Sequence, residues 1–325
     1  MNVLRSLNKA LDGTVGWRRL GYAASFTIIA ISLSVLYRIL KNVRADEVIA
    51  ALKRTDAHDL IGAGLCLSGV FLTLTLYDVF ALRTIGRRDV PYHAAALSSF
   101  ASFSIGHNIG VVLFASAVIR LRIYSAWGLG AVDVLKICFI TGLTFWLGNA
   151  VVLGLAMSFH PDAASAINQL APELNRSVAV ATLAAILIYL FWLSLKPRVI
   201  GMRTWKVVLP GPQLTLVQIG IGFVDLTLCS LAMYFLMPDA PRIEFLPLVV
   251  IFITSTLLGF LSHAPSGLGV FDAAMLVGLH QFETGELVAS LLLFRFLYYV
   301  LPLTAALTFL GIREAHRAWI GRARA

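Results

Sequence analysis

The chain has 325 residues, of which 59% are hydrophobic and 13% are charged, and its formal net charge is +9. Soluble domains carry about 25% charged residues, so this composition excludes an ordinary soluble domain. Apolar runs of roughly 18 or more residues recur along the chain, and each is long enough to span a bilayer. Because the runs are continuous and do not alternate, we expect an all-α polytopic membrane protein and no β-barrel.

The positive charge does not point to nucleic acid. The basic residues flank the apolar runs, which predicts positive-inside topology and contact with anionic membrane phospholipids. The cysteines Cys66, Cys138 and Cys229 lie singly within apolar runs, so we expect neither a metal site nor disulfides. No nucleotide-binding or catalytic motif occurs at usable spacing. We therefore expect no cofactor and no enzymatic activity.

In chain order, we expect a basic N-terminus at 1–19, one transmembrane domain at 20–312 and a basic tail at 313–325. The first apolar run has no small-residue cleavage site, so we expect a retained span and no signal peptide. A short amphipathic helix is expected within 41–59. The expected apolar segments are 21–40, 60–82, 91–119, 131–159, 178–195, 214–237, 245–280 and 287–311.

The distribution of charge predicts the topology. Of the 26 Lys and Arg, 17 lie in five basic segments, whereas 41–59, 160–176 and 238–244 are acidic or balanced. Placing the basic segments in the cytoplasm makes both termini cytoplasmic. It also makes 91–119 start and end inside, and 245–280 start and end outside. The five basic segments are 1–19, 83–88, 120–122, 196–206 and 313–325.

Both segments must therefore enter the membrane and turn back, which leaves about six full spans and two re-entrant helical hairpins. The halves 20–159 and 177–312 would then form an inverted repeat, as in secondary transporters. Asp78 would correspond to Asp225 in the second half. The alternative is that two glycine-rich kinks occur in ordinary spans.

Each predicted hairpin contains a polar, glycine-containing elbow. The first elbow includes Gly106 and Gly110, and the second includes Pro265, Gly267 and Gly269. Proline and glycine disfavour a continuous helix. Such backbone is tolerated at membrane depth only where it is buried in protein or lines a wet cavity, so we expect the functional site there.

Three stretches, 104–110, 119–128 and 263–272, together resemble a known family. They are similar to the transmembrane region of bacterial lysylphosphatidylglycerol synthase/flippases of the MprF type, and of YbhN-like members that lack the synthase domain. The resemblance runs over about 20–312. It implies a multi-pass inner-membrane protein that handles phospholipid. Because the chain stops at Ala325, we expect no synthase domain.

The second elbow departs from the family pattern, which commonly reads Pro-Gly-Gly and ends in Glu. Here it reads Pro265-Ser266-Gly267 and ends in Asp272. Serine tolerates left-handed backbone less well than glycine. The headgroup recognised by the family is therefore not assumed for this chain.

Several polar residues could bind a lipid headgroup. Arg120 and Arg122 could hold a phosphate or anchor the chain by snorkelling. Tyr124 follows in the same stretch. The elbow residues could hydrogen-bond a headgroup, or could cap broken helix ends. These elbow residues are His107, Asn108 and His263.

Charged residues within apolar segments are the remaining candidates. An unpaired mid-span carboxylate costs roughly 2.5–3.5 kcal/mol, which favours a function. Asp225 and Asp272 could receive a cationic headgroup, and Asp225 could take a proton. Arg295, within the last span, is also a candidate to bind the headgroup. Alternatively, Asp225 and Arg295 form an ion pair with each other.

The leading hypothesis is a phospholipid translocator for an anionic or aminoacylated phospholipid. One alternative is a membrane scaffold that serves a separate lipid-modifying enzyme. The other is an exporter of a polyprenol-linked glycan.

Overall fold

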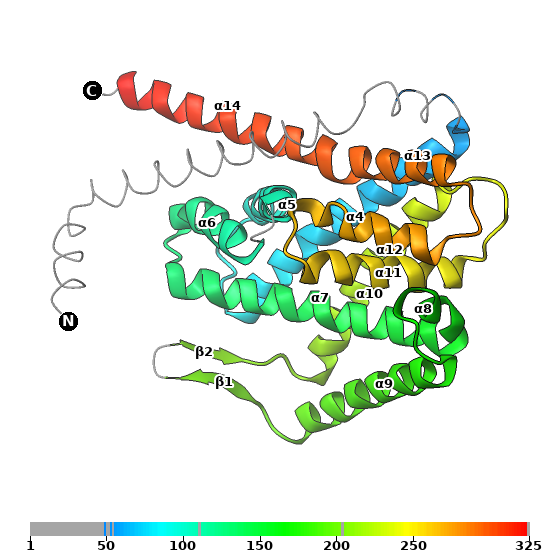
Figure 1. The fold of residues 1–325 in the computed structure, drawn as a ribbon. Helices are drawn as coiled ribbons and strands as arrows, with labels where there is room; N and C mark the ends of the chain where they lie inside the picture. Colours follow the sequence, from blue (N-terminus) through cyan, green and yellow to red (C-terminus); the bar gives the residue numbers. More distant parts are fainter. Residues whose placement is uncertain (1–48, 50–52, 54, 110–111, 203–204, 324–325) are drawn as a thin grey trace, which may run out of the picture.

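The computed structural model describes residues 49, 53, 55–109, 112–202 and 205–323, and almost all of its regular structure is helical (Figure 1). The expected N-terminus at 1–19, the first span at 21–40, most of 41–59 and Gly110 lie outside the described residues. The helices are α4 (Ala57–Thr84), α5 (Tyr92–Ile109), α6 (Val112–Tyr124), α7 (Ala131–Phe159), α8 (Pro161–Asn168), α9 (Pro172–Leu195), α10 (Pro212–Phe235), α11 (Phe245–Leu261), α12 (Val270–Gly278), α13 (Thr284–Arg295) and α14 (Leu301–Ala323).

Five helices in the described part of the chain are long and apolar enough to cross a membrane: α4, α7, α9, α10 and the continuous helix Thr284–Ile312. Phe245–Leu261 is apolar but shorter. This confirms the expectation of a multi-pass helical membrane protein. The acidic connection at 160–176 is more structured than expected, because it contains α8 and the first turn of α9, each of which starts at a proline.

Two further elements differ from expectation. The basic connection at 196–206 contains an antiparallel hairpin of β1 (Val199–Met202) and β2 (Trp205–Val208), so the chain is not strictly all-helical. The last span contains a π-helical turn, η3 (Phe296–Val300), before Pro302. Proline has no N–H for the carbonyl four residues back, which explains a local change of helix type. Helix α14 continues to Ala323, through most of the expected tail.

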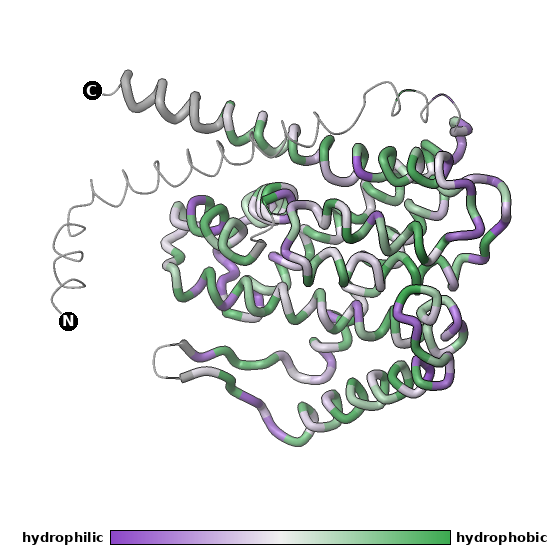
Figure 2. The backbone as a smooth tube through the Cα atoms, viewed as in Figure 1, coloured by the Kyte–Doolittle hydropathy of each residue, from purple (hydrophilic) through white to green (hydrophobic). Residues whose placement is uncertain are grey.

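Helix α9 exposes most of its apolar surface on the outside of the bundle. Only 11% of the most apolar 18-residue stretch of this helix is buried inside the bundle. Leu187, Ile188 and Phe191 are each 67% exposed. Figure 2 shows hydrophobic residues along this helix, whereas hydrophilic stretches concentrate in connections. An exposed apolar helix of this length is what a lipid-facing span requires.

The basic connections gather at one end of the bundle. Arg83, at the end of α4, lines a cavity of about 580 Å³ together with Lys196 and Arg198. Arg87 donates a hydrogen bond to the carbonyl of Trp127, between α6 and α7. Figure 1 shows the connections around α8, and those between α10 and α11 and between α12 and α13, at the opposite end. The predicted separation of basic from acidic connections is therefore present in the bundle.

Two helix pairs fold back on themselves. Helices α5 and α6 are joined by reciprocal hydrogen bonds, in which Ser116 Oγ donates to the Ser102 carbonyl at 3.1 Å and Ser102 Oγ donates to the Ser116 carbonyl at 3.4 Å. Helix α12 returns along α11, because Gly267 lies against Gly259 while Gly278 lies against Ile251. Each pair therefore begins and ends at the same end of the bundle.

The long helices pack around a buried apolar core, and α7 crosses α10 at unusually close range. A Cβ atom added at Gly148 would lie 2.6 Å from Gly222 Cα, and one added at Gly222 would lie 2.8 Å from Gly148 Cα. Only glycine allows two backbones to approach this closely. The crossing holds the first half of the described chain against the second.

We predict that Gly222→Ala forces α7 and α10 apart and lowers stability by about 1–3 kcal/mol, the usual effect of overpacking. The matched control is Gly220→Ala on the same helix, where an added Cβ meets nothing within 4 Å. That change should be neutral or stabilising by up to about 1 kcal/mol. Thermal unfolding in detergent measures both, and equal midpoints for the two variants would contradict the proposed close crossing.

Candidate functional site

The two hairpin elbows meet in the interior of the bundle. Ser266, in the 3₁₀ turn η2 (Pro265–Gly267), donates from Oγ to Asn108 Oδ1 at 2.7 Å. The Asn108 amide also donates to the Ser104 carbonyl at 2.6 Å. Asn108 and Ser266 are 1% and 4% exposed. Two polar stretches singled out separately in the sequence are thus one cluster.

The second elbow is tightly turned. Positive φ angles occur at His263 (54°), Ser266 (52°), Gly267 (62°) and Gly269 (83°). Ser266 therefore occupies the left-handed conformation that disfavours a residue with Cβ. In the first hairpin, Gly106 lies within α5 and not at the turn, because the helix continues to Ile109.

Arg295 fixes the second elbow to α13. Its guanidinium donates from Nε to Asp272 Oδ1 at 2.9 Å and from Nη2 to Oδ2 at 2.7 Å. Its Nη1 donates to the Ser266 carbonyl at 3.2 Å. Asp272 also accepts from the Gly269 N–H at 3.0 Å, at the start of α12. The alternative pairing of Arg295 with Asp225 is therefore wrong, and its partner is Asp272.

A second bidentate pair fixes the first hairpin to α4. Arg120 donates from Nη2 to Asp78 Oδ1 at 2.7 Å, and from Nε to both carboxylate oxygens at 3.2 Å. The Tyr124 hydroxyl donates to Asp78 Oδ2 at 2.6 Å. Asp78 and Arg120 are 0% and 7% exposed. Asp78 was expected only as a counterpart of Asp225, and its pairing with Arg120 was not predicted. Arg122 is half-buried at the end of α6.

Asp225 has a different environment. It lies on α10, is 5% exposed, and accepts at Oδ2 from the Tyr77 hydroxyl at 3.0 Å. Its Oδ1 has no hydrogen-bond partner among the described residues. No Lys, Arg or His of the described chain lies within ion-pair distance of it, unlike Asp78 and Asp272.

Two adjacent cavities flank the place where the elbows meet. The smaller, of about 60 Å³, has mostly apolar walls, and its lining also includes the polar residues Asp225, His263 and Ser266. The larger, of about 290 Å³, is lined by Tyr77 and Arg120 among others. Four residues line both cavities, namely Phe103, His107, Phe145 and Phe260.

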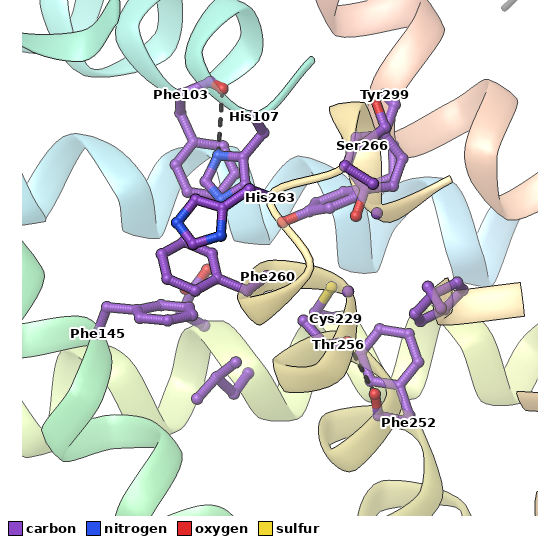
Figure 3. Close-up of a pocket in the computed structure, with 17 residues that line it drawn as sticks. Phe103, His107, Phe145, Cys229, Phe252, Thr256, Phe260, His263, Ser266 and Tyr299 are labelled. Atoms are coloured by element: carbon purple, nitrogen blue, oxygen red, sulfur yellow. Dashed lines mark hydrogen bonds between the residues drawn. The ribbon is translucent and has the colours of Figure 1, made fainter. Parts of the chain in front are cut away.

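These shared residues form a wall of rings between the two cavities. Figure 3 shows His107 beside Phe103, with His263 near Phe260, and the ring centroids of Phe103 and His107 are 3.9 Å apart. The His107 Nδ1 lies 3.3 Å from the Phe103 carbonyl, which fixes the imidazole against α5. Sequence reasoning missed the phenylalanines, because an aromatic residue in an apolar run carries no distinguishing signal.

The larger cavity reaches the outer surface of the bundle. Its lining includes Leu113 of α6 and Trp146 of α7, which are 59% and 45% exposed. The surface around them is apolar and would face lipid. Within the described residues, no group of three or more His, Cys, Asp or Glu side chains could hold a metal ion.

We predict that Ser266→Ala lowers stability by about 1–3 kcal/mol, because the buried Asn108 carbonyl loses its donor. Ser266→Gly loses the same hydrogen bond but relieves the left-handed backbone, a gain of about 1–2 kcal/mol. Thermal unfolding in detergent should therefore rank Ser266→Gly above Ser266→Ala. The opposite order, or two midpoints equal to wild type, would contradict the described elbow contact.

Comparisons with known proteins support this architecture. No sequence model of a known family matches the chain. The uncharacterized protein slr0712 of Synechocystis is 27% identical, and the match covers 88% of this chain and 89% of that protein. The inner membrane protein YbhN of Escherichia coli is 26% identical, with 87% of this chain and 88% of YbhN covered.

A phosphatidylglycerol lysyltransferase of Staphylococcus haemolyticus is 25% identical over 87% of this chain but over 33% of its own length. The match therefore covers one part of that larger protein. The chain therefore has the apolar helices of a multi-pass membrane protein, and it is similar over most of its length to YbhN and to about one third of a phosphatidylglycerol lysyltransferase.

Proposed function

We propose that the chain is an inner-membrane translocator for a phospholipid with an anionic or aminoacylated headgroup. The larger cavity carries this proposal. It combines a buried arginine with an opening at the apolar surface. A headgroup could occupy such a cavity while the acyl chains remain in the bilayer. The names of two relatives, an inner membrane protein and a phosphatidylglycerol lysyltransferase, support the same location and lipid class.

The size of the larger cavity suits a headgroup. Ligand pockets usually measure about 300–1,000 Å³, and this cavity has about 290 Å³. The smaller cavity, of about 60 Å³, has room for about two waters at roughly 30 Å³ each. The proposal therefore places the headgroup beside Arg120 and not beside Asp225.

Arg120 retains the capacity to hold a phosphate although it is paired. Its Nε and Nη2 bind Asp78, whereas Nη1 has a 3.9 Å contact with Cys138 Sγ. A guanidinium has five N–H donors in a fixed fork. Asp78 would hold this fork in place, and the Nη1 edge would receive a phosphate oxygen. The Asp78–Arg120 pair would act as a pre-positioned binding group.

The paired hairpins support alternating access. We propose that α5–α6 and α11–α12 are re-entrant hairpins that enter from opposite sides, and that the two halves form an inverted repeat. In the described part the order is span, hairpin, span, then span, span, hairpin, span. Discontinuous helices at the centre of such repeats form the substrate sites of secondary transporters. The wall of rings between the two cavities would be the barrier that moves when the headgroup passes.

We predict that Gly142→Phe blocks translocation by filling the larger cavity. Gly142 lines this cavity, and a Cβ added there meets nothing within 4 Å, so the fold should tolerate the larger side chain. Vesicles containing the purified protein and fluorescent phosphatidylglycerol or lysylphosphatidylglycerol report movement as loss of protection from an external quencher. Wild type should expose the inner-leaflet probe, and Gly142→Phe should reduce the rate at least tenfold.

The matched control is Gly220→Phe, on the exposed face of α10, where an added Cβ also meets nothing. It should translocate at the wild-type rate. Absence of movement for both lipids in wild type would overturn the proposal and favour a scaffold for a lipid-modifying enzyme. Equal rates in all three proteins would show that the larger cavity is not the path.

A further inference from the structure

The buried charges of the described spans are unevenly compensated. Arg120 and Arg295 are each committed to a carboxylate by two or more hydrogen bonds. Among the described residues, the hydrogen-bond partner of Asp225 is a neutral tyrosine hydroxyl, its Oδ1 has no partner, and the residue is 5% exposed. A buried carboxylate without a cation is more stable when it carries a proton. Among the described residues, Asp225 is therefore the buried acid whose charge is free to change.

The smaller cavity gives this carboxylate a route to water. Asp225 lines the cavity, and the exposed His263 lies on the same wall. The other titratable groups that face the cavity are Tyr298 and Tyr299 of η3, His107 of α5 and Cys229 of α10. Helix α4 contributes Tyr77 through its hydrogen bond, and α7 contributes only Phe145 to this lining. Of the residues that the structure describes, no lysine, arginine or second carboxylate lines this cavity.

Tyr77 connects the two cavities. Its hydroxyl donates to Asp225, which lines the smaller cavity, while Tyr77 itself lines the larger one. When Asp225 is ionised, the tyrosine O–H is held by the carboxylate. When Asp225 is protonated, its own O–H can donate to the tyrosine oxygen. The tyrosine O–H is then free to donate to an acceptor in the larger cavity.

We infer that Asp225 is a proton-binding site, and that its protonation is coupled through Tyr77 to occupation of the larger cavity by a phosphate-bearing headgroup. This inference rests on the proposed function. The carboxylate takes one proton from cavity water and becomes a neutral acid. The headgroup leaves on the opposite side of the membrane, Tyr77 again donates to the carboxylate, and Asp225 releases its proton to water on that side. One proton therefore crosses the membrane with each headgroup.

Infrared pH-difference spectra of the purified full chain in lipid test the protonation step without any transport assay. Wild type should show a titrating carbonyl band of a protonated carboxylic acid, which Asp225→Asn removes and Asp225→Glu retains. Asp239→Asn, in the exposed connection after α10, should leave the band unchanged. A band that persists in Asp225→Asn, or no titrating band in wild type, would overturn the site.

Vesicles with an imposed pH gradient test the coupling step. For one coupled proton, the ratio of labelled phosphatidylglycerol between leaflets should shift up to tenfold per pH unit in wild type. Asp225→Asn should equilibrate the lipid without this shift, and Asp239→Asn should behave like wild type. Gradient-independent movement in wild type, or dependence on sodium at constant pH, would overturn the coupling but not the translocator. Absence of any lipid movement would instead overturn the proposed function. The infrared experiment would still decide whether Asp225 takes a proton.

Discussion

The contact between the two hairpin elbows is the constraint on which the rest of the structure depends. Two chain segments turn back inside the bundle, and the second turn, at 262–269, interrupts the helical hydrogen bonding between α11 and α12. Backbone groups at such a break must be satisfied internally, because lipid offers no hydrogen bonds. Ser266 binds Asn108, and Arg295 binds the Ser266 carbonyl. A side-chain hydrogen bond thus joins the two elbows, and α13 satisfies one backbone carbonyl of the second elbow.

Charge pairing fixes where each hairpin sits. Asp78 on α4 holds Arg120 at the end of the first hairpin, and Arg295 on α13 holds Asp272 at the start of α12. For the buried Asp78–Arg120 pair, removing one partner costs about 3–5 kcal/mol, whereas the intact pair contributes little net stability. These ion pairs therefore determine the position of each hairpin in the bundle but contribute little to the stability of the fold. Among the described residues, the same arrangement leaves Asp225 without a cationic partner, and this distinguishes it from Asp78 and Asp272.

The features recovered from sequence are those with a strong local signal. Long apolar runs predicted α4, α7, α9 and α10, and glycine with proline predicted the second elbow. The charge distribution predicted which connections gather at one end, because basic residues concentrate in short loops. Both elbows were predicted because polar residues interrupt their apolar segments, and a continuous transmembrane helix rarely contains such residues.

The features that sequence missed depend on tertiary contact. Asp78 and Arg120 are 42 residues apart, and no periodicity links them. The predicted Asp225–Arg295 ion pair was wrong. The sequence shows that a charge within a span needs a partner, but it does not show which oppositely charged residue lies close enough to be that partner. Gly106 looked like an elbow residue, yet a helix can continue through a single glycine at a modest cost. In the wall of rings between the cavities, His107 was expected as a site residue, whereas the three phenylalanines resemble any other apolar residue of a span.

The most direct test is the side of the membrane from which the ends of the second hairpin are reached. Single cysteines at Phe245, the first residue of α11, and at His280, just after α12, would be labelled with a membrane-impermeant maleimide in sealed, oriented vesicles. The hairpin predicts that both label from the same face. Labelling from opposite faces would show that α11 and α12 together cross the membrane, and would contradict the account.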